Sequence, residues 1–96
     1  MPALVIVEVR PRAAEKMGEY SAAAGPTMAA FGGEFVDRGK FIEALSGSTT
    51  AHGLGIIRFP DVQAAKHWFM SPEYQAIVPL REEAADMSFR LYEVAG

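Results

Sequence analysis

The sequence predicts an α+β domain in which one antiparallel sheet has its helices on a single face. Three observations lead to this prediction. Stretches of β-forming residues with alternating apolar positions occur near both ends of the chain and in its middle. Segments with apolar residues at helical spacing separate them. The chain has 96 residues, half of them apolar, so residues 1–96 are expected to form one domain with its own core.

The first strand is predicted over residues 3–10. Its valines occupy alternate positions on one face, and Leu4 and Ile6 lie on the other face, so both faces are apolar. Pro11 ends the strand, because proline has no N–H to donate to a neighbouring strand.

A helix follows Pro11, with Tyr20 on its apolar stripe. The pair Gly25-Pro26 is expected to interrupt this helix, because a residue before proline avoids the α region. Gly32 or Gly33 then supplies the C-terminal stop of the helical region.

The middle of the chain is predicted to form two strands. Residues 34–46 are rich in β-forming residues, and Gly39 in their middle is expected to mark a bulge or a kink. A loop over residues 47–53 leads to a strand over residues 54–59, which is apolar on both faces and ends at Pro60.

The last third of the chain is predicted to be helical and then to end in a strand. Asp61 is a favourable N-cap for one helix, and Ser71 is a favourable N-cap for the next. This second helical segment is expected over about residues 72–85, with a bend at Pro79. The final strand is expected over residues 87–94.

The order of elements is thus β-α-β-β-α-β, the ferredoxin-like pattern, with an antiparallel sheet and both helices on one face. The second face of such a sheet should be polar. In this sequence the first and third strands are apolar on both faces, and an identical sheet from a second copy is the simplest cover. The sequence therefore predicts a homodimer formed through sheet faces.

Composition argues against several classes of function. The net charge is −3 and the nine Lys and Arg residues are scattered, which is not typical of nucleic-acid binding. There is no cysteine, and neither His52 nor His67 has a partner at metal-ligand spacing, so no metal site is expected. The glycine-rich pattern of nucleotide sites is missing, and no cofactor is expected. No apolar run reaches the length of about 18 residues needed to span a membrane, and residues 1–10 do not resemble a signal peptide, so we expect a cytoplasmic protein.

Several short motifs recur in a known family: Gly32-Gly33, Arg38-Gly39, LSG at residues 45–47, FPDVQAAKHWFMSPEYQ at residues 59–75, and Arg81. On these motifs the chain resembles the bacterial domain-of-unknown-function family 1330, within the dimeric α+β barrel superfamily, over nearly its whole length. The resemblance implies a ferredoxin-like protomer and a homodimer with facing sheets. It implies little about activity, because relatives in the superfamily include cofactor-free monooxygenases, isomerases, dehalogenating enzymes and haem-degrading enzymes.

Residues 70–83, MSPEYQAIVPLREE, allow a structural and a functional interpretation. Ser71 and the proline after it are typical of a helix start, which favours a structural role. Alternatively, the free N–H groups of that helix start, with Tyr74 nearby, bind a carboxylate. Trp68, Tyr74 and Tyr20 are likewise either core residues or the lining of an apolar cleft between helices and sheet.

Similar alternatives remain open for the roles of the charged and ionisable residues. Arg38 lies in a predicted strand and either forms a structural ion pair or, like Arg81, binds a substrate carboxylate bidentately. His52 is expected in a surface loop rather than as a catalytic base. Removal of Met1 would leave Pro2 as a secondary amine, as in tautomerases, although the rest of the chain does not resemble them.

Two hypotheses for function follow. In the first, a homodimer holds a small apolar metabolite that carries a carboxylate, with or without cofactor-free isomerase or oxygenase-like chemistry. Its candidate substrate-binding residues are Tyr20, Arg38, Trp68, Ser71, Tyr74 and Arg81. In the second, the chain is a non-catalytic dimeric module that binds a ligand or a protein. A general base with an orienting partner would distinguish the two, and none is evident in the sequence.

Overall fold

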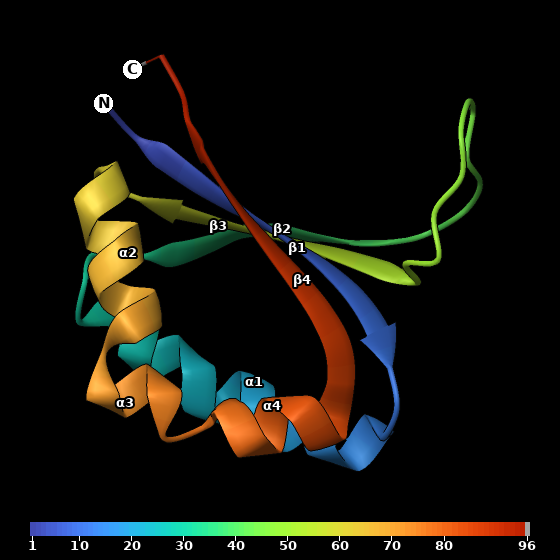
Figure 1. Cartoon of the computed structure of the whole chain (residues 1–96), viewed down its shortest axis with the longest axis horizontal. Coiled ribbons are helices and arrows are strands. Elements are labelled where there is room, and N and C mark those ends of the chain that lie inside the picture. The colour runs from blue at the N-terminus through green and yellow to red at the C-terminus, as the bar shows by residue number, and fades with distance from the viewer. Residues whose placement is uncertain (96) are drawn as a thin grey trace.

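The computed structural model describes residues 1–95 and shows one four-stranded sheet with the helices on one side of it (Figure 1). The strands are β1 (Ala3–Pro11), β2 (Glu34–Lys40), β3 (Gly53–Phe59) and β4 (Ala85–Glu93), and the helices are α1 (Ala14–Ala29), α2 (Val62–Met70), α3 (Pro72–Gln75) and α4 (Val78–Ala84). The sheet order is β2-β3-β1-β4, and every pair is antiparallel. The predicted α+β, ferredoxin-like fold is confirmed.

The two faces of the sheet differ because side chains alternate along each strand. On β1, Val5 and Val7 are buried against the helices, whereas Leu4 and Ile6 are only half-buried on the other side. We call this second side the open face. Directly paired residues share a face, so Tyr92, which is opposite Leu4, also belongs to the open face. The second face therefore carries an apolar patch, as the sequence predicts, and charged residues such as Glu8, Arg58 and Arg90 lie on the same face.

The core lies between the helices and the sheet and is rich in aromatic rings. Its largest fully buried side chains are Trp68, Tyr74, Phe59, Met28 and Ile57. The ring of Trp68 lies 5.3 Å from that of Phe59 on β3 and 4.4 Å from that of Tyr74 on α3. These contacts join α2 and α3 to the sheet.

The predicted interruption at Gly25-Pro26 is wrong, because α1 continues through both residues to Ala29. Buried residues on either side of Pro26, Ala24 and Met28, pack into the core and hold the helix together across it. Beyond the helix, Gly32 has a φ of 77° and Gly33 donates its N–H to the Met28 carbonyl over 2.9 Å. The predicted glycine stop is confirmed.

The predictions for the second strand also need correction. Strand β2 ends at Lys40 rather than at residue 46, because its partner β3 begins at Gly53, which is opposite Lys40. The irregularity is at Val36, between Phe35 and Asp37, and not at Gly39. This bulge changes which side chains face the helices, because one extra residue reverses the alternation that follows.

The helical segment predicted over residues 72–85 is two helices, α3 and α4, rather than one bent helix. Pro79 lies in the first turn of α4, where a missing N–H costs no helical hydrogen bond. The last strand accordingly begins at Ala85. Both predicted N-caps are confirmed: Asp61 accepts from the N–H of Ala64 and Ser71 accepts from the N–H of Tyr74.

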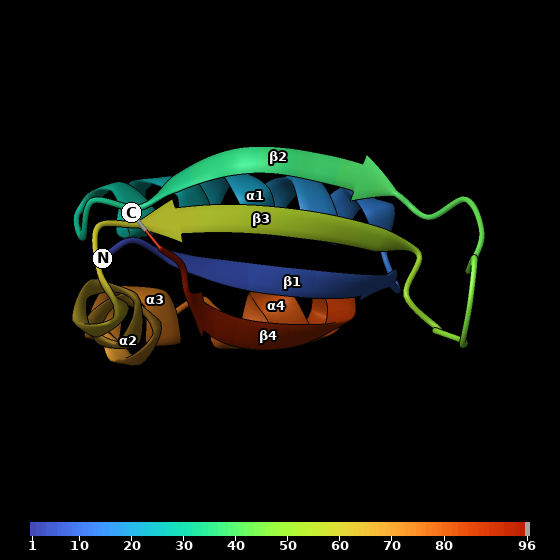
Figure 2. The same cartoon turned by 90° about the horizontal axis from the view of Figure 1, so that it is seen from above.

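The loop between β2 and β3, residues 41–52, projects well beyond the end of the sheet (Figure 2). We call it the arm. Its apolar side chains are largely exposed: Phe41 by 40%, Ile42 by 80% and Leu45 by 93%. Figure 1 shows that the arm rises on the side of the open face. No helix in the described part of the chain is long and apolar enough to cross a membrane.

Candidate functional site

Three of the predicted site residues form a hydrogen-bonded chain inside the helical layer. The hydroxyl groups of Tyr20 on α1 and Tyr74 on α3 lie 2.7 Å apart. Arg81 on α4 donates from Nη1 to the Tyr74 hydroxyl over 3.0 Å, and its Nη2 lies 3.0 Å from Glu82 Oε1. Only 12% of the Arg81 side chain is exposed. Two hydrogen bonds, one buried and one partly buried, therefore join three helices.

Tyr20 and Arg81, at the two ends of these hydrogen bonds, both keep their protons. Burial, followed by the neighbouring Tyr74, raises the pKa of Tyr20 far above its ordinary value, so its hydroxyl stays neutral at physiological pH. Burial acts against the charge of Arg81, but its hydrogen bonds to Tyr74 and Glu82 raise its pKa nonetheless. The guanidinium also lies 5.0 Å from the centre of the Phe89 ring, a favourable cation–π contact. Arg81 is thus already engaged within the protein.

Trp68 and Ser71 are fully engaged in the fold as well. The Trp68 ring is completely buried, and its Nε1 donates to Thr27 Oγ1 over 3.0 Å. The Ser71 hydroxyl donates to the Trp68 carbonyl over 2.7 Å and accepts from the Tyr74 N–H over 3.2 Å. The start of α3 is therefore held by its own side-chain cap.

Ser71→Ala is expected to lower the free energy of unfolding by about 0.5–2 kcal/mol, because the cap hydrogen bond to Tyr74 is lost. Urea unfolding followed by circular dichroism measures this change. Ser48→Ala, in the exposed arm, is the control and should stay within about 0.5 kcal/mol of the unaltered protein. Equal stability of both variants would contradict a capping role for Ser71.

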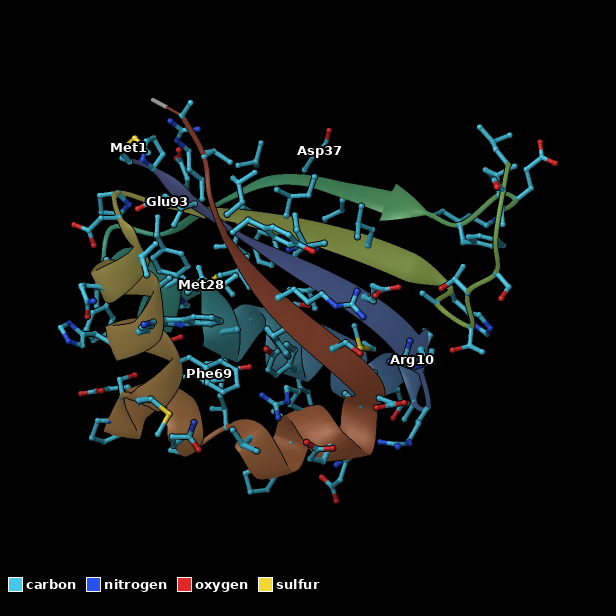
Figure 3. The ribbon with its side chains drawn as sticks, turned by 45° about the horizontal axis from the view of Figure 1, so that its top comes forward. Met1, Arg10, Met28, Asp37, Phe69 and Glu93 are labelled. Carbon is cyan, nitrogen blue, oxygen red and sulfur yellow. The ribbon has the colours of Figure 1, made fainter. Side chains whose placement is uncertain are left out.

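A cavity of about 90 Å³, here called the inner cleft, lies between α1 and the sheet. Tyr20 lines it from the helix and Arg38 lines it from β2. The Val36 bulge explains this position, because Asp37 pairs with Ile56 on the open face and Arg38 then pairs with Gly55 on the helix side. In Figure 3, Asp37 points away from the sheet on the open side, whereas Met28 lies beneath the sheet.

Arg38 is exposed to solvent, and the cleft that it borders is mostly apolar. Its guanidinium lies 4.3 Å from the centre of the Phe35 ring. Within residues 1–95 it forms no ion pair with a carboxylate, so the predicted structural ion pair is not found. The other residues of the inner cleft are mostly apolar: Val7, Val9, Met17, Ser21, Met28, Phe35, Leu54, Gly55, Ile57, Met87 and Phe89.

A second hollow, the outer groove, lies between α2 and β4 and has a volume of about 360 Å³. Trp68, Phe69 and Phe89 form part of its apolar wall, and Lys66 contributes the positive charge on α2. Figure 3 labels Phe69, whose ring lies 5.4 Å from that of Phe89. Phe89 lines both hollows, so its ring lies between them.

The structure thus divides the predicted site. Tyr20 and Arg38 line the inner cleft, Trp68 lines the outer groove, and Ser71, Tyr74 and Arg81 line neither. Sequence reasoning did not single out Phe89. The alternation of Met87, Phe89 and Leu91 along the last strand would have placed it on the helix side.

The chemistry available in the inner cleft is limited to one cation and two hydroxyl groups. No carboxylate or histidine of the described residues lines it. His52 and His67 are both exposed. Nor does any group of three His, Asp or Glu side chains within residues 1–95 lie in a position to hold a metal ion.

The sequence pattern described as "Domain of unknown function (DUF1330)" matches residues 2–95. The chain belongs to this family. The resemblance inferred from the motifs around residues 59–75 is therefore confirmed. No curated protein matches the chain.

Solved structures agree with the fold. A protein of unknown function from Rhodopseudomonas palustris is 26% identical, with a TM-score of 0.80 over 99% of this chain and 83% of that one. SnoaB, a cofactor-independent oxygenase from Streptomyces nogalater, is 12% identical, with a TM-score of 0.72 over 99% and 94%. A dimeric ferredoxin-like protein of unknown function from Jannaschia is 14% identical, with a TM-score of 0.67 over 98% and 100%. The latter two share the fold with this DUF1330 chain.

Proposed function

We propose that the chain forms a homodimer through its open face and binds, in the inner cleft, a small apolar molecule that carries a carboxylate. The observation that supports the ligand class is the position of Arg38. Arg38 borders a mostly apolar cavity and has no carboxylate partner among the described residues. A carboxylate that enters the cleft would form the bidentate pair that the protein itself leaves unmade.

The size of the cleft limits the ligand. One bound water needs roughly 10–15 Å³ of such volume, so about 90 Å³ holds several waters or one small organic acid. Met17, Met28 and Met87 line the same cleft, and methionine side chains adapt easily to the shape of a guest. A small aromatic or branched aliphatic acid fits these walls better than a sugar or a nucleotide.

Binding is better supported than catalysis. Proton abstraction needs a base, and Tyr20 keeps its proton because burial raises its pKa. Cofactor-free isomerase or oxygenase-like chemistry is the second candidate, since SnoaB, a cofactor-independent oxygenase, has a similar fold. That likeness is one of fold, and the same fold serves many functions. A non-catalytic dimeric binding module therefore agrees best with the groups that line the cleft.

The proposal of a homodimer rests on the open face and on the arm. Leu54 on the open face is 39% exposed and Tyr92 is 50% exposed, and the apolar side chains of the arm are more exposed still. Soluble monomers rarely leave contiguous apolar patches uncovered. The Jannaschia protein, which has a similar fold, is described as dimeric.

The ligand proposal is tested by thermal unfolding with a panel of small aromatic and aliphatic acids and their neutral primary amides. At about 100 times its dissociation constant, a ligand specific to the folded state adds about 2.7 kcal/mol of stability. For a domain of this size that corresponds to a rise in Tm of roughly 10 °C or more. Acids are expected to raise the Tm, and their amides to have a much smaller effect.

Two matched variants locate the site. Arg38→Gln should abolish the shift caused by acids, because the anchoring cation is lost. Lys66→Gln removes a cation from the outer groove instead and should leave the shift unchanged. The proposal fails if acids and amides act equally, or if Lys66→Gln abolishes the shift and Arg38→Gln does not.

A further inference from the structure

The two ends of the open face differ in shape. At one end the arm projects from the sheet, and at the other end lie both chain termini (Figure 2). Tyr92, 50% exposed, is on the open face at the end with the termini, where it pairs with Leu4. An exposed aromatic side chain and an exposed apolar arm thus lie at opposite ends of one molecule.

A hollow of about 310 Å³ lies on the open face where the arm leaves the sheet. We call it the socket. Phe41 and Ala51 of the arm line it together with Leu54 of β3, and its wall is mainly apolar. Glu8 lies at its edge, where Thr49 of the arm donates a hydrogen bond to it over 3.3 Å. The socket is large enough for an aromatic ring.

Resting on the homodimer proposed above, we propose that its two-fold axis crosses the strands, so that each arm lies over the end of the partner that carries the termini. In this arrangement Tyr92 of each copy enters the socket of the other. The exposed Leu45 and Ile42 of each arm then pack against the apolar residues at that end, which include Leu4 and the 67%-exposed Met1. Both contacts form twice, as a closed two-fold dimer requires.

The shape of the arm favours this arrangement over one with the axis along the strands. In Figure 2 the arm lies beyond the end of the sheet and runs from the side of β2 toward the side of β4, and in Figure 1 it rises toward the side where the partner would lie. An axis along the strands would bring both arms to the same end, where they would compete for the same space. The ends with Tyr92 would then face each other, and each socket would face a second socket.

Charge agrees with the arrangement. Glu43 is exposed in the arm, and Arg58 is exposed on the open face at the end with the termini, opposite Leu4. Neither takes part in an ion pair within residues 1–95. An axis across the strands brings the arm of one copy, with Glu43, to the end of the other that carries Arg58. An axis along the strands would keep them at opposite ends.

The absence of cysteine from the sequence allows a direct test by cross-linking. The double variant Leu45→Cys with Tyr92→Cys is treated with a short bis-maleimide, alongside each single variant. The two positions lie at opposite ends of a molecule 32 Å long, so a short linker cannot join them within one chain. The double variant is expected to form a covalent dimer, and each single variant is expected to remain uncross-linked.

Light scattering measures the mass of each variant before the linker is added and so shows whether the variant is still a dimer. A wrong arrangement can then be distinguished from the loss of the dimer. Ile42→Cys with Glu93→Cys is a second pair that keeps both Tyr92 and Leu45, should their loss weaken association. A covalent dimer from any single variant would overturn the proposal, because it requires identical ends to meet. The proposal would also be overturned if light scattering shows that the double variants are dimers and neither of them is cross-linked. A monomeric mass for the unaltered protein would overturn both the arrangement and the homodimer.

Discussion

Trp68→Ala is expected to lower the free energy of unfolding by about 3–5 kcal/mol, the range typical of a buried aromatic side chain replaced by alanine. Trp68 is completely buried and contacts the rings of Phe59, Phe69, Tyr74 and Phe89. Its loss leaves a cavity at the centre of this cluster and removes the only side-chain donor to Thr27 found within residues 1–95. The Tm should fall by more than about 12 °C.

Urea unfolding followed by far-ultraviolet circular dichroism is the appropriate measurement, because the variant lacks the tryptophan that fluorescence would report. His67→Ala is the matched control, since His67 is the neighbouring residue and is exposed. It should change stability by no more than about 0.5 kcal/mol. A loss below about 1 kcal/mol for Trp68→Ala would mean that its ring mainly lines a cavity and does not support the core.

The second large effect is expected on assembly. If the proposed dimer forms, Ile56→Asp should raise its dissociation constant by at least about 100-fold, because the change places an unpaired carboxylate in the proposed interface. Ile56 lies on the open face, directly opposite Ile6 of the central strand β1. Within one protomer Ile56 is only half-buried, so the protomer itself should tolerate the change far better than the dimer.

Sedimentation over a wide range of protein concentration measures this dissociation. Ala22→Asp is the control, because Ala22 lies on the exposed side of α1, away from the open face. It adds the same charge and should leave the dimer intact. If Ile56→Asp and Ala22→Asp show the same mass at every concentration, the open face is not the interface.

The order of elements could be predicted from the sequence because local patterns determine it. Alternating apolar residues locate the strands, and the caps Asp61 and Ser71 form the predicted hydrogen bonds. The apolar character of both faces of β1 was also visible in the sequence. Proline was less informative: Pro26 lies inside a helix, since the packing of residues on either side outweighs its local cost.

The site could be predicted only in part, because its geometry depends on pairing between distant segments. The direction of Arg38 depends on the bulge at Val36, and the bulge depends on the register between β2 and β3. A strand with regular alternation would place Arg38 on the opposite face from Phe35, outside the inner cleft. The sequence could likewise not show that Tyr74 and Arg81 would bond to each other and to Tyr20 rather than face a cavity.

The most direct test of the proposed binding function is a crystal structure of the protein grown with the acid that raises its Tm most, or with benzoate if no acid does so. We expect electron density for the acid in the inner cleft, with its carboxylate within hydrogen-bonding distance of both terminal nitrogens of Arg38. The hydrocarbon part should lie against Tyr20 and the methionine side chains of the cleft. An acid bound in the outer groove beside Trp68 and Lys66, or an empty inner cleft with Arg38 turned into solvent, would contradict the account.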